Sequence, residues 1–138
     1  MSQDLICSVD KFEDMLYTQL VLQKRLGYDF IHMTYEERTA FIKEMSIHLN
    51  QEVNEALYEL PFFKPWKDYS KMTEEEKQDA FSKFIDELVD AWHFFMNLIL
   101  AADITPEEFY KRYLAKNKEN HKRQDKGYTH DISYRKET

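Results

Sequence analysis

Apolar residues recur every three or four positions along most of the chain, which is the spacing of an amphipathic α-helix. Three of these runs begin with a threonine that is followed three residues later by a glutamate, a capping box that marks a helix start. These threonines are Thr34, Thr73 and Thr105, and Pro106 stands at the favoured first helical position. The pattern predicts four helices, over about residues 9–26, 35–60, 74–102 and 106–122.

The scarcity of turn residues supports an all-α fold. The 138 residues include only 2 Gly and 3 Pro, too few for a β-sheet protein rich in turns. We predict a four- to five-helix bundle in which four helices surround one core and the second and third pair antiparallel. A single domain is expected over residues 1–128, with a polar C-terminal tail over 129–138.

The charge and cysteine content narrow the range of partners. A formal net charge of −7 argues against binding of a nucleic-acid polymer. The sequence has no apolar run long enough to cross a membrane and no signal peptide, and its single cysteine, Cys7, fits a reducing compartment. We therefore expect a cytoplasmic protein.

Positive charge is concentrated near the C-terminus. Residues 111–126 hold seven Lys or Arg against two acids. This cluster either binds phosphate or complements the dipole at a helix C-terminus.

Two pairs of carboxylates have the spacing that places both members on one side of a helix. They are Glu52 with Glu55, and Glu87 with Asp90. At about 100° per residue, each pair falls at the edge of its helix's apolar stripe, so two antiparallel helices would bring the pairs together. The stripes used for this placement are Ile42, Leu49, Val53, Ala56 and Leu60 on the second helix, and Phe84, Leu88, Ala91 and Phe95 on the third.

Four converging carboxylates repel one another unless a cation lies among them. Oxygen ligands without cysteine favour Mg²⁺ or Mn²⁺ over zinc. The alternative is that these acids are merely solvated residues at the boundary of amphipathic helices.

Other polar and aromatic residues have more than one interpretation. Gln19 and Gln23 are surface residues by default but could pair with a base edge. His93 projects away from the predicted core, as a surface residue or an oligomer contact does. Trp66 could stack on a base, although packing against the core is the favoured interpretation.

In order along the chain, these residues resemble the dimeric all-α dUTPases of the MazG-like NTP pyrophosphohydrolase superfamily, and phage dCTP/dUTP pyrophosphatases as well. The resemblance covers roughly residues 15–60 and 80–128. It rests on Gln19 and Gln23; Glu52-x-x-Glu55; Phe63-Lys64-Pro65-Trp66-Lys67; Glu87-x-x-Asp90-Ala-Trp-His93-Phe94; Asn97; and Lys116-Asn117-x-x-Asn120-x-x-Arg123-Gln124-x-x-Gly127-Tyr128.

The resemblance implies a Mg²⁺-dependent dUTP diphosphatase, with Mn²⁺ as a possible substitute and dUDP as a further candidate substrate. A homodimer whose site is completed across the interface is expected. The two acid pairs would coordinate the metal, and one member of the first pair would orient the attacking water. The base and sugar would be bound by Gln19 or Gln23, Trp66, His93 and Asn97, and the phosphates by Lys116, Asn120, Arg123 and Tyr128. Lys67 is a further substrate-binding residue.

One departure from the family pattern leaves the base preference open. Many of these enzymes carry a uracil-reading asparagine where this chain has Leu26 and Gly27. Alternative substrates are therefore dCTP or a broader range of NTPs. A non-catalytic interaction module, with Phe62, Phe63 and Trp66 as partner anchors, is an alternative of a different class.

Overall fold

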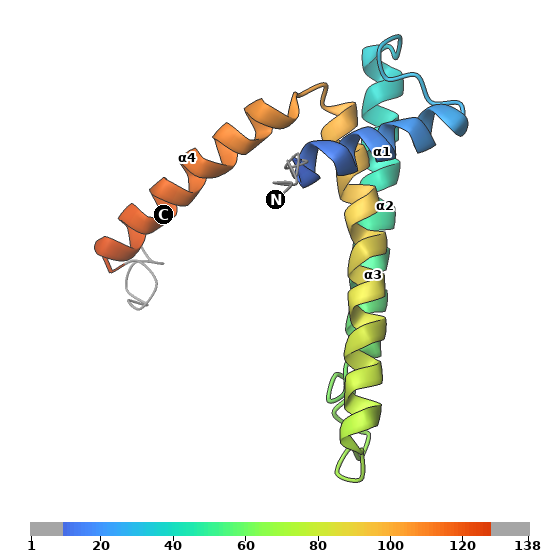
Figure 1. Ribbon diagram of the computed structural model, residues 1–138, viewed down its shortest axis with the longest axis vertical. Coiled ribbons are helices and arrows are strands. Elements are labelled where there is room, and N and C mark those ends of the chain that lie inside the picture. Colours follow the sequence, from blue (N-terminus) through green and yellow to red (C-terminus); the bar gives the residue numbers. More distant parts are fainter. Residues whose placement is uncertain (1–9, 128–138) are drawn as a thin grey trace, which may run out of the picture. The chain divides into compact units, whose positions relative to one another are not determined.

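The computed structural model describes residues 10–127, and every regular element within them is an α-helix (Figure 1). The all-α prediction is therefore confirmed, and each helix begins and ends within a few residues of its predicted bounds. Cys7, Tyr128 and the predicted tail lie outside the described residues. The helices are α1 (Lys11–Arg25), α2 (Tyr35–Glu59), α3 (Glu74–Ala101) and α4 (Pro106–Asp125).

The predicted caps explain why the helix starts match so well. The Thr34 hydroxyl accepts from the Glu37 amide at 3.1 Å, and the Glu37 carboxylate accepts from the Thr34 amide at 2.9 Å. The same reciprocal pair joins Thr73 to Glu76 at the start of α3. Each cap satisfies amide groups that a helix start leaves without an intrahelical partner.

The helices α2 and α3 form a long antiparallel hairpin, and residues 60–73 connect them at one end (Figure 1). Near the other end α1 crosses the hairpin and packs against α3. The chain divides into two compact units, one ending at Asp103 and the other beginning at Ile104 and containing α4. The prediction of one domain over residues 1–128 stays a prediction.

The hydrophobic core belongs to the first unit. We predicted one core inside four helices, but α4 contributes no buried residue. Among the described residues, the buried apolar side chains come from the first three helices and from the connection between α1 and α2. They are Leu16, Phe30, Phe41, Met45, Ala56, Ala91, Met96, Ile99 and Ala101.

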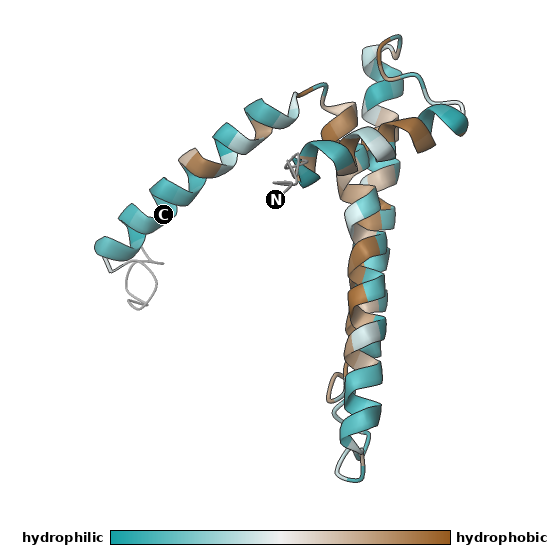
Figure 2. Ribbon diagram, in the orientation of Figure 1, coloured by the Kyte–Doolittle hydropathy of each residue, from teal (hydrophilic) through white to brown (hydrophobic). Residues whose placement is uncertain are grey.

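The contact face between α2 and α3 is rotated toward the acids relative to the predicted stripes. Val53 and Leu88, which were predicted to face the core, are exposed, whereas Glu52 and Glu87 are half-buried. The reason is that α3 carries two apolar faces, one packed against α2 and one exposed. The predicted stripe lies between these two faces because the sequence pattern does not distinguish them. Figure 2 shows a polar N-terminal end of α3 and apolar residues from its middle to its C-terminal end.

Arg38 ties the end of the hairpin to the connection between α1 and α2. Its guanidinium donates to the Ala101 carbonyl at 2.6 Å and to the Phe30 carbonyl at 2.8 Å. A cation at the C-terminal carbonyls of α3 also complements the helix dipole. This contact helps to hold α1 in place across the hairpin.

Within the described residues, no single helix is both long enough and apolar enough to cross a membrane.

Candidate active site

The antiparallel hairpin brings the two acid pairs together. Glu52 of α2 and Glu87 and Asp90 of α3 each offer one carboxylate oxygen, and these three oxygens lie within 4.8 Å of one another. Glu52 of the first pair therefore faces both members of the second pair across the contact between α2 and α3. The predicted convergence is found for these three acids, whereas Glu55 is not one of the grouped ligands.

The electrostatics of the cluster include Glu55 as well. Partial burial, followed by the charges of Glu55, Asp90 and Glu87, raises the pKa of Glu52 above its usual value. Burial and then the charges of Glu55 and Asp90 likewise raise the pKa of Glu87. The charges of Glu55 and Asp90 thus act on both Glu52 and Glu87, and like-charged carboxylates repel unless a counter-ion lies among them.

This arrangement fits a hard divalent cation. The three grouped ligands are all carboxylates, and hard oxygen donors suit Mg²⁺ or Mn²⁺. A cation among them would offset the repulsion that, together with burial, raises the pKa values of Glu52 and Glu87. Metal coordination by Glu52, Glu55, Glu87 and Asp90 nevertheless stays a prediction.

A buried polar network lies between α1 and α3, one to two helical turns beyond Asp90 along α3. The Gln19 amide nitrogen donates to the Asn97 carbonyl oxygen at 2.8 Å, and the Gln19 carbonyl oxygen contacts His93 Nδ1 at 2.8 Å. Gln19 and Asn97 are each only 3% exposed, and Gln23 is buried one turn further along α1. The default interpretation of both glutamines as surface residues is wrong, because α1 turns this face onto α3.

His93 exposes more of its surface than its partners do, as its position on the helix predicted. It is not a free surface residue, however, because its ring nitrogen is tied to Gln19 of another helix. His93, the exposed member of the network, lies one helical turn beyond Asp90 on α3, whereas Gln19 and Asn97 lie beneath the surface.

Trp66 and Lys67 lie in the connection at the end of the hairpin opposite to α1 (Figure 1). Trp66 is 77% exposed, so the favoured interpretation of core packing is wrong. Two prolines keep this connection out of helix, and Phe62 adopts a left-handed backbone with φ of 69°. Within one chain, the structure does not bring these two residues to the polar network around Gln19.

The predicted phosphate ligands on α4 belong to the second unit and are exposed. Lys116 and Arg123 contact Glu119 of the same helix at 3.1 and 2.7 Å. These two cations hold the pKa of Glu119 below its usual value, and Asn120 lies one turn beyond Lys116. Tyr128 lies outside the described residues, so phosphate binding by this group stays a prediction.

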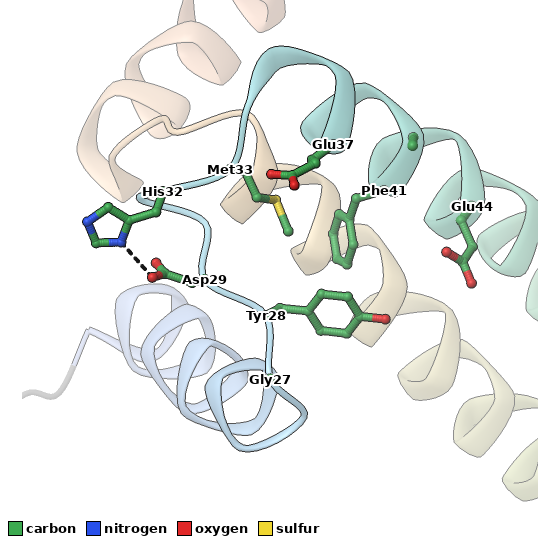
Figure 3. A pocket seen from close by; sticks show the side chains of 9 residues that line it. Gly27, Tyr28, Asp29, His32, Met33, Glu37, Phe41 and Glu44 are labelled. Atoms are coloured by element: carbon green, nitrogen blue, oxygen red, sulfur yellow. Dashed lines mark hydrogen bonds and ion pairs between the residues drawn. The ribbon is translucent and has the colours of Figure 1, made fainter.

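Sequence reasoning missed a surface cavity of about 490 Å³ beside the connection from α1 to α2 (Figure 3). The rings of Tyr28 and Phe41 line it, and the His32–Asp29 pair lies at its edge. Gly27 also lines the cavity and ends α1 with φ of 95°, a conformation that favours glycine. None of the predicted site residues lines this cavity, so it is separate from the carboxylate site.

Comparison with known proteins gives independent information on the chain. A family model described as dUTPase matches residues 11–109. The dCTP pyrophosphatase of Enterobacteria phage LZ5 is 31% identical over 153 aligned positions, which span 92% of this chain and 88% of that protein. The dCTP pyrophosphatase of Enterobacteria phage T4 is 38% identical over 73 positions, which span 48% of this chain and 42% of that protein. No solved structure shows a significant match.

Proposed function

Because the chain belongs to the all-α dUTPase family and is a nucleoside triphosphate diphosphatase, we propose that it hydrolyses dUTP to dUMP and pyrophosphate with Mg²⁺ as its cofactor. The observation that carries this proposal is that one carboxylate oxygen from each of Glu52, Glu87 and Asp90, on two helices, lies within 4.8 Å of the others. Such a group of oxygen ligands suits a cation that also binds substrate phosphates. With dUDP as substrate, the same attack would release dUMP and phosphate.

A second substrate, dCTP, is favoured by two observations. Both relatives described above are named dCTP pyrophosphatases. In addition, Gly27 lies near the position where the family resemblance places a uracil-reading asparagine, and its φ of 95° is one that few other residues adopt easily. A broader NTP range is the third alternative.

The proposed chemistry divides among the residues as follows. Mg²⁺, when bound by the two acid pairs, would neutralise the triphosphate and polarise its phosphorus. Glu52 or Glu55 orients the attacking water and accepts its proton. Lys116 and Arg123 hold the phosphate oxygens and stabilise their growing charge.

Base recognition is assigned to the buried amide network. Carboxamides offer both donors and acceptors, so Gln19 and Asn97 suit the mixed edge of a pyrimidine. The paired network supports this role because it holds His93, its exposed member, in one orientation.

A nucleotide panel with pyrophosphate detection tests the proposed function and separates its alternatives. We expect dUTP, dCTP or both to be cleaved at least about tenfold more efficiently than the purine nucleotides, since unpaired buried polar groups discriminate strongly. Equal cleavage of all NTPs would favour the broader enzyme. Absence of pyrophosphate with every nucleotide, at saturating Mg²⁺, would contradict the proposal and favour a non-catalytic module.

We further propose a homodimer that completes the site. An exposed apolar stripe follows one side of α3 with the four- and three-residue spacing of a helix–helix seam. A second copy seated there would bury this stripe and could bring its own Trp66 and Lys67 to the base site. The stripe consists of Phe81, Ile85, Leu88 and Phe95.

Sedimentation equilibrium tests the dimer. Ile85 is 56% exposed, so Ile85→Lys should leave the chain folded but place a charge in the interface and shift the protein toward monomer. Ile47→Lys is the matched control, because Ile47 is also exposed but lies on α2 outside the stripe. A wild-type monomer at micromolar concentration, or equal behaviour of both variants, would contradict this interface.

A further inference from the structure

The buried amide network ends on a sulfur atom. The Asn97 amide nitrogen donates to Met45 Sδ at 3.4 Å, so the chain of contacts runs from Met45 through Asn97 and Gln19 to His93. Met45 is buried, on α2, and belongs to the core cluster with Phe41. It is the one member of the network that the sequence analysis did not single out.

A thioether sulfur can accept a hydrogen bond but cannot donate one. The amide nitrogen of Asn97 therefore faces Met45, which leaves the Asn97 oxygen to face the Gln19 nitrogen. The Gln19 oxygen must then face His93 Nδ1, and because that oxygen only accepts, Nδ1 carries the proton. In the neutral ring, Nε2 is consequently left as an acceptor.

The opposite orientation is the natural competitor. If both carboxamides rotated together, the Asn97 nitrogen would donate to the Gln19 oxygen, and the Gln19 nitrogen would donate to an unprotonated His93 Nδ1. The number of bonds among these three residues would be unchanged. The two orientations differ at Met45, where the Asn97 oxygen would then face a sulfur atom that has no hydrogen to donate.

We propose that Met45 is a positioning residue for pyrimidine recognition: its sulfur fixes the donor–acceptor direction of the Asn97–Gln19–His93 network. This direction presents His93 Nε2 as an acceptor toward an N–H donor of a pyrimidine, either the ring N–H of uracil or the amino group of cytosine. The inference rests on the proposed function for its substrate. The orientation itself depends only on the contacts within the network.

The test replaces Met45 with leucine, which has a similar volume but no acceptor. Met96→Leu is the matched control, because Met96 is similarly buried on α3 but the sulfur that accepts from Asn97 is that of Met45. Long-range ¹H–¹⁵N NMR reads which ring nitrogen of His93 is protonated. Steady-state kinetics with dUTP and dCTP measure how well the pyrimidine is recognised.

We expect His93 to carry its proton on Nδ1 in the wild type and in Met96→Leu, and to populate the Nε2–H form in Met45→Leu. The kcat/KM for dUTP or dCTP, whichever is cleaved, should fall by about two- to tenfold in Met45→Leu only, the range of one modest hydrogen bond. A wild-type Nε2–H ring, or a Met45→Leu variant that matches Met96→Leu in both readouts, would overturn the inference. If no nucleotide is cleaved, the proposed function fails, and the NMR result still decides what Met45 does.

Discussion

Replacing Asp90 or Glu52 with alanine is expected to reduce pyrophosphate release by at least about 100-fold, while the circular dichroism of the helices stays unchanged. The expected loss is large because each side chain supplies one of the three grouped oxygens. Removing even a residue that merely supports a metal ligand typically costs about 10–100-fold, and a ligand itself costs more. Asp90 is exposed, so its removal leaves no cavity in the core.

Asp86→Ala provides the control for this experiment. Asp86 lies one turn before Asp90 on the same helix and is also exposed, but it is not one of the grouped ligands. The Asp86→Ala variant should retain most of the wild-type activity. Full activity of Asp90→Ala or Glu52→Ala, or equal losses in Asp86→Ala and Asp90→Ala, would contradict the assignment of the metal ligands.

Replacing Glu52 with glutamine should raise the melting temperature of the metal-free protein near pH 7 by a few degrees while abolishing activity. The pKa of Glu52 is raised in the folded state by burial and by its acidic neighbours, so the folded state favours its protonated form. The stability that this group contributes is present below its unfolded pKa and is lost as the pH rises through the higher folded value. At pH 7 the ionised group destabilises the fold, and glutamine removes that repulsion.

Thermal melts with and without Mg²⁺, from pH 5 to pH 8, measure this effect. The wild type should gain stability from Mg²⁺ at neutral pH, whereas Glu52→Gln should gain much less, because binding to the folded state alone raises stability. Glu44→Gln is the control, since Glu44 is exposed on the same helix and outside the cluster. A drop in metal-free stability for Glu52→Gln, or an unchanged response to Mg²⁺, would contradict the picture of a repulsive cluster neutralised by a cation.

The helix boundaries and the convergence of the acids could be predicted because they depend on local rules. A threonine and a glutamate three residues apart satisfy the amide groups of a helix start wherever they occur, as Thr34 and Thr73 show. Once the two long helices were recognised as an antiparallel pair, the level at which Glu52 meets Asp90 followed from the hairpin geometry.

The rotation of the helices and the burial of the polar network depend on partners that lie far away in the sequence. Leu88 and Phe95 are exposed because α3 has more apolar surface than α2 covers. Gln19 is buried because α1 crosses α3, and a buried carboxamide looks the same in the sequence as an exposed one. Trp66 was assigned to the core as the favoured interpretation of an isolated tryptophan, although two prolines hold it in an exposed connection.

The central claim is that the two acid pairs hold a divalent cation between α2 and α3, and an anomalous difference map from crystals soaked in Mn²⁺ tests it most directly. A peak bonded to oxygens of Glu52, Glu87 and Asp90 is the predicted result, because Mn²⁺ prefers the same oxygen ligands as Mg²⁺. A well-ordered hairpin with no peak between these carboxylates, or with its Mn²⁺ bound elsewhere, would contradict the claim.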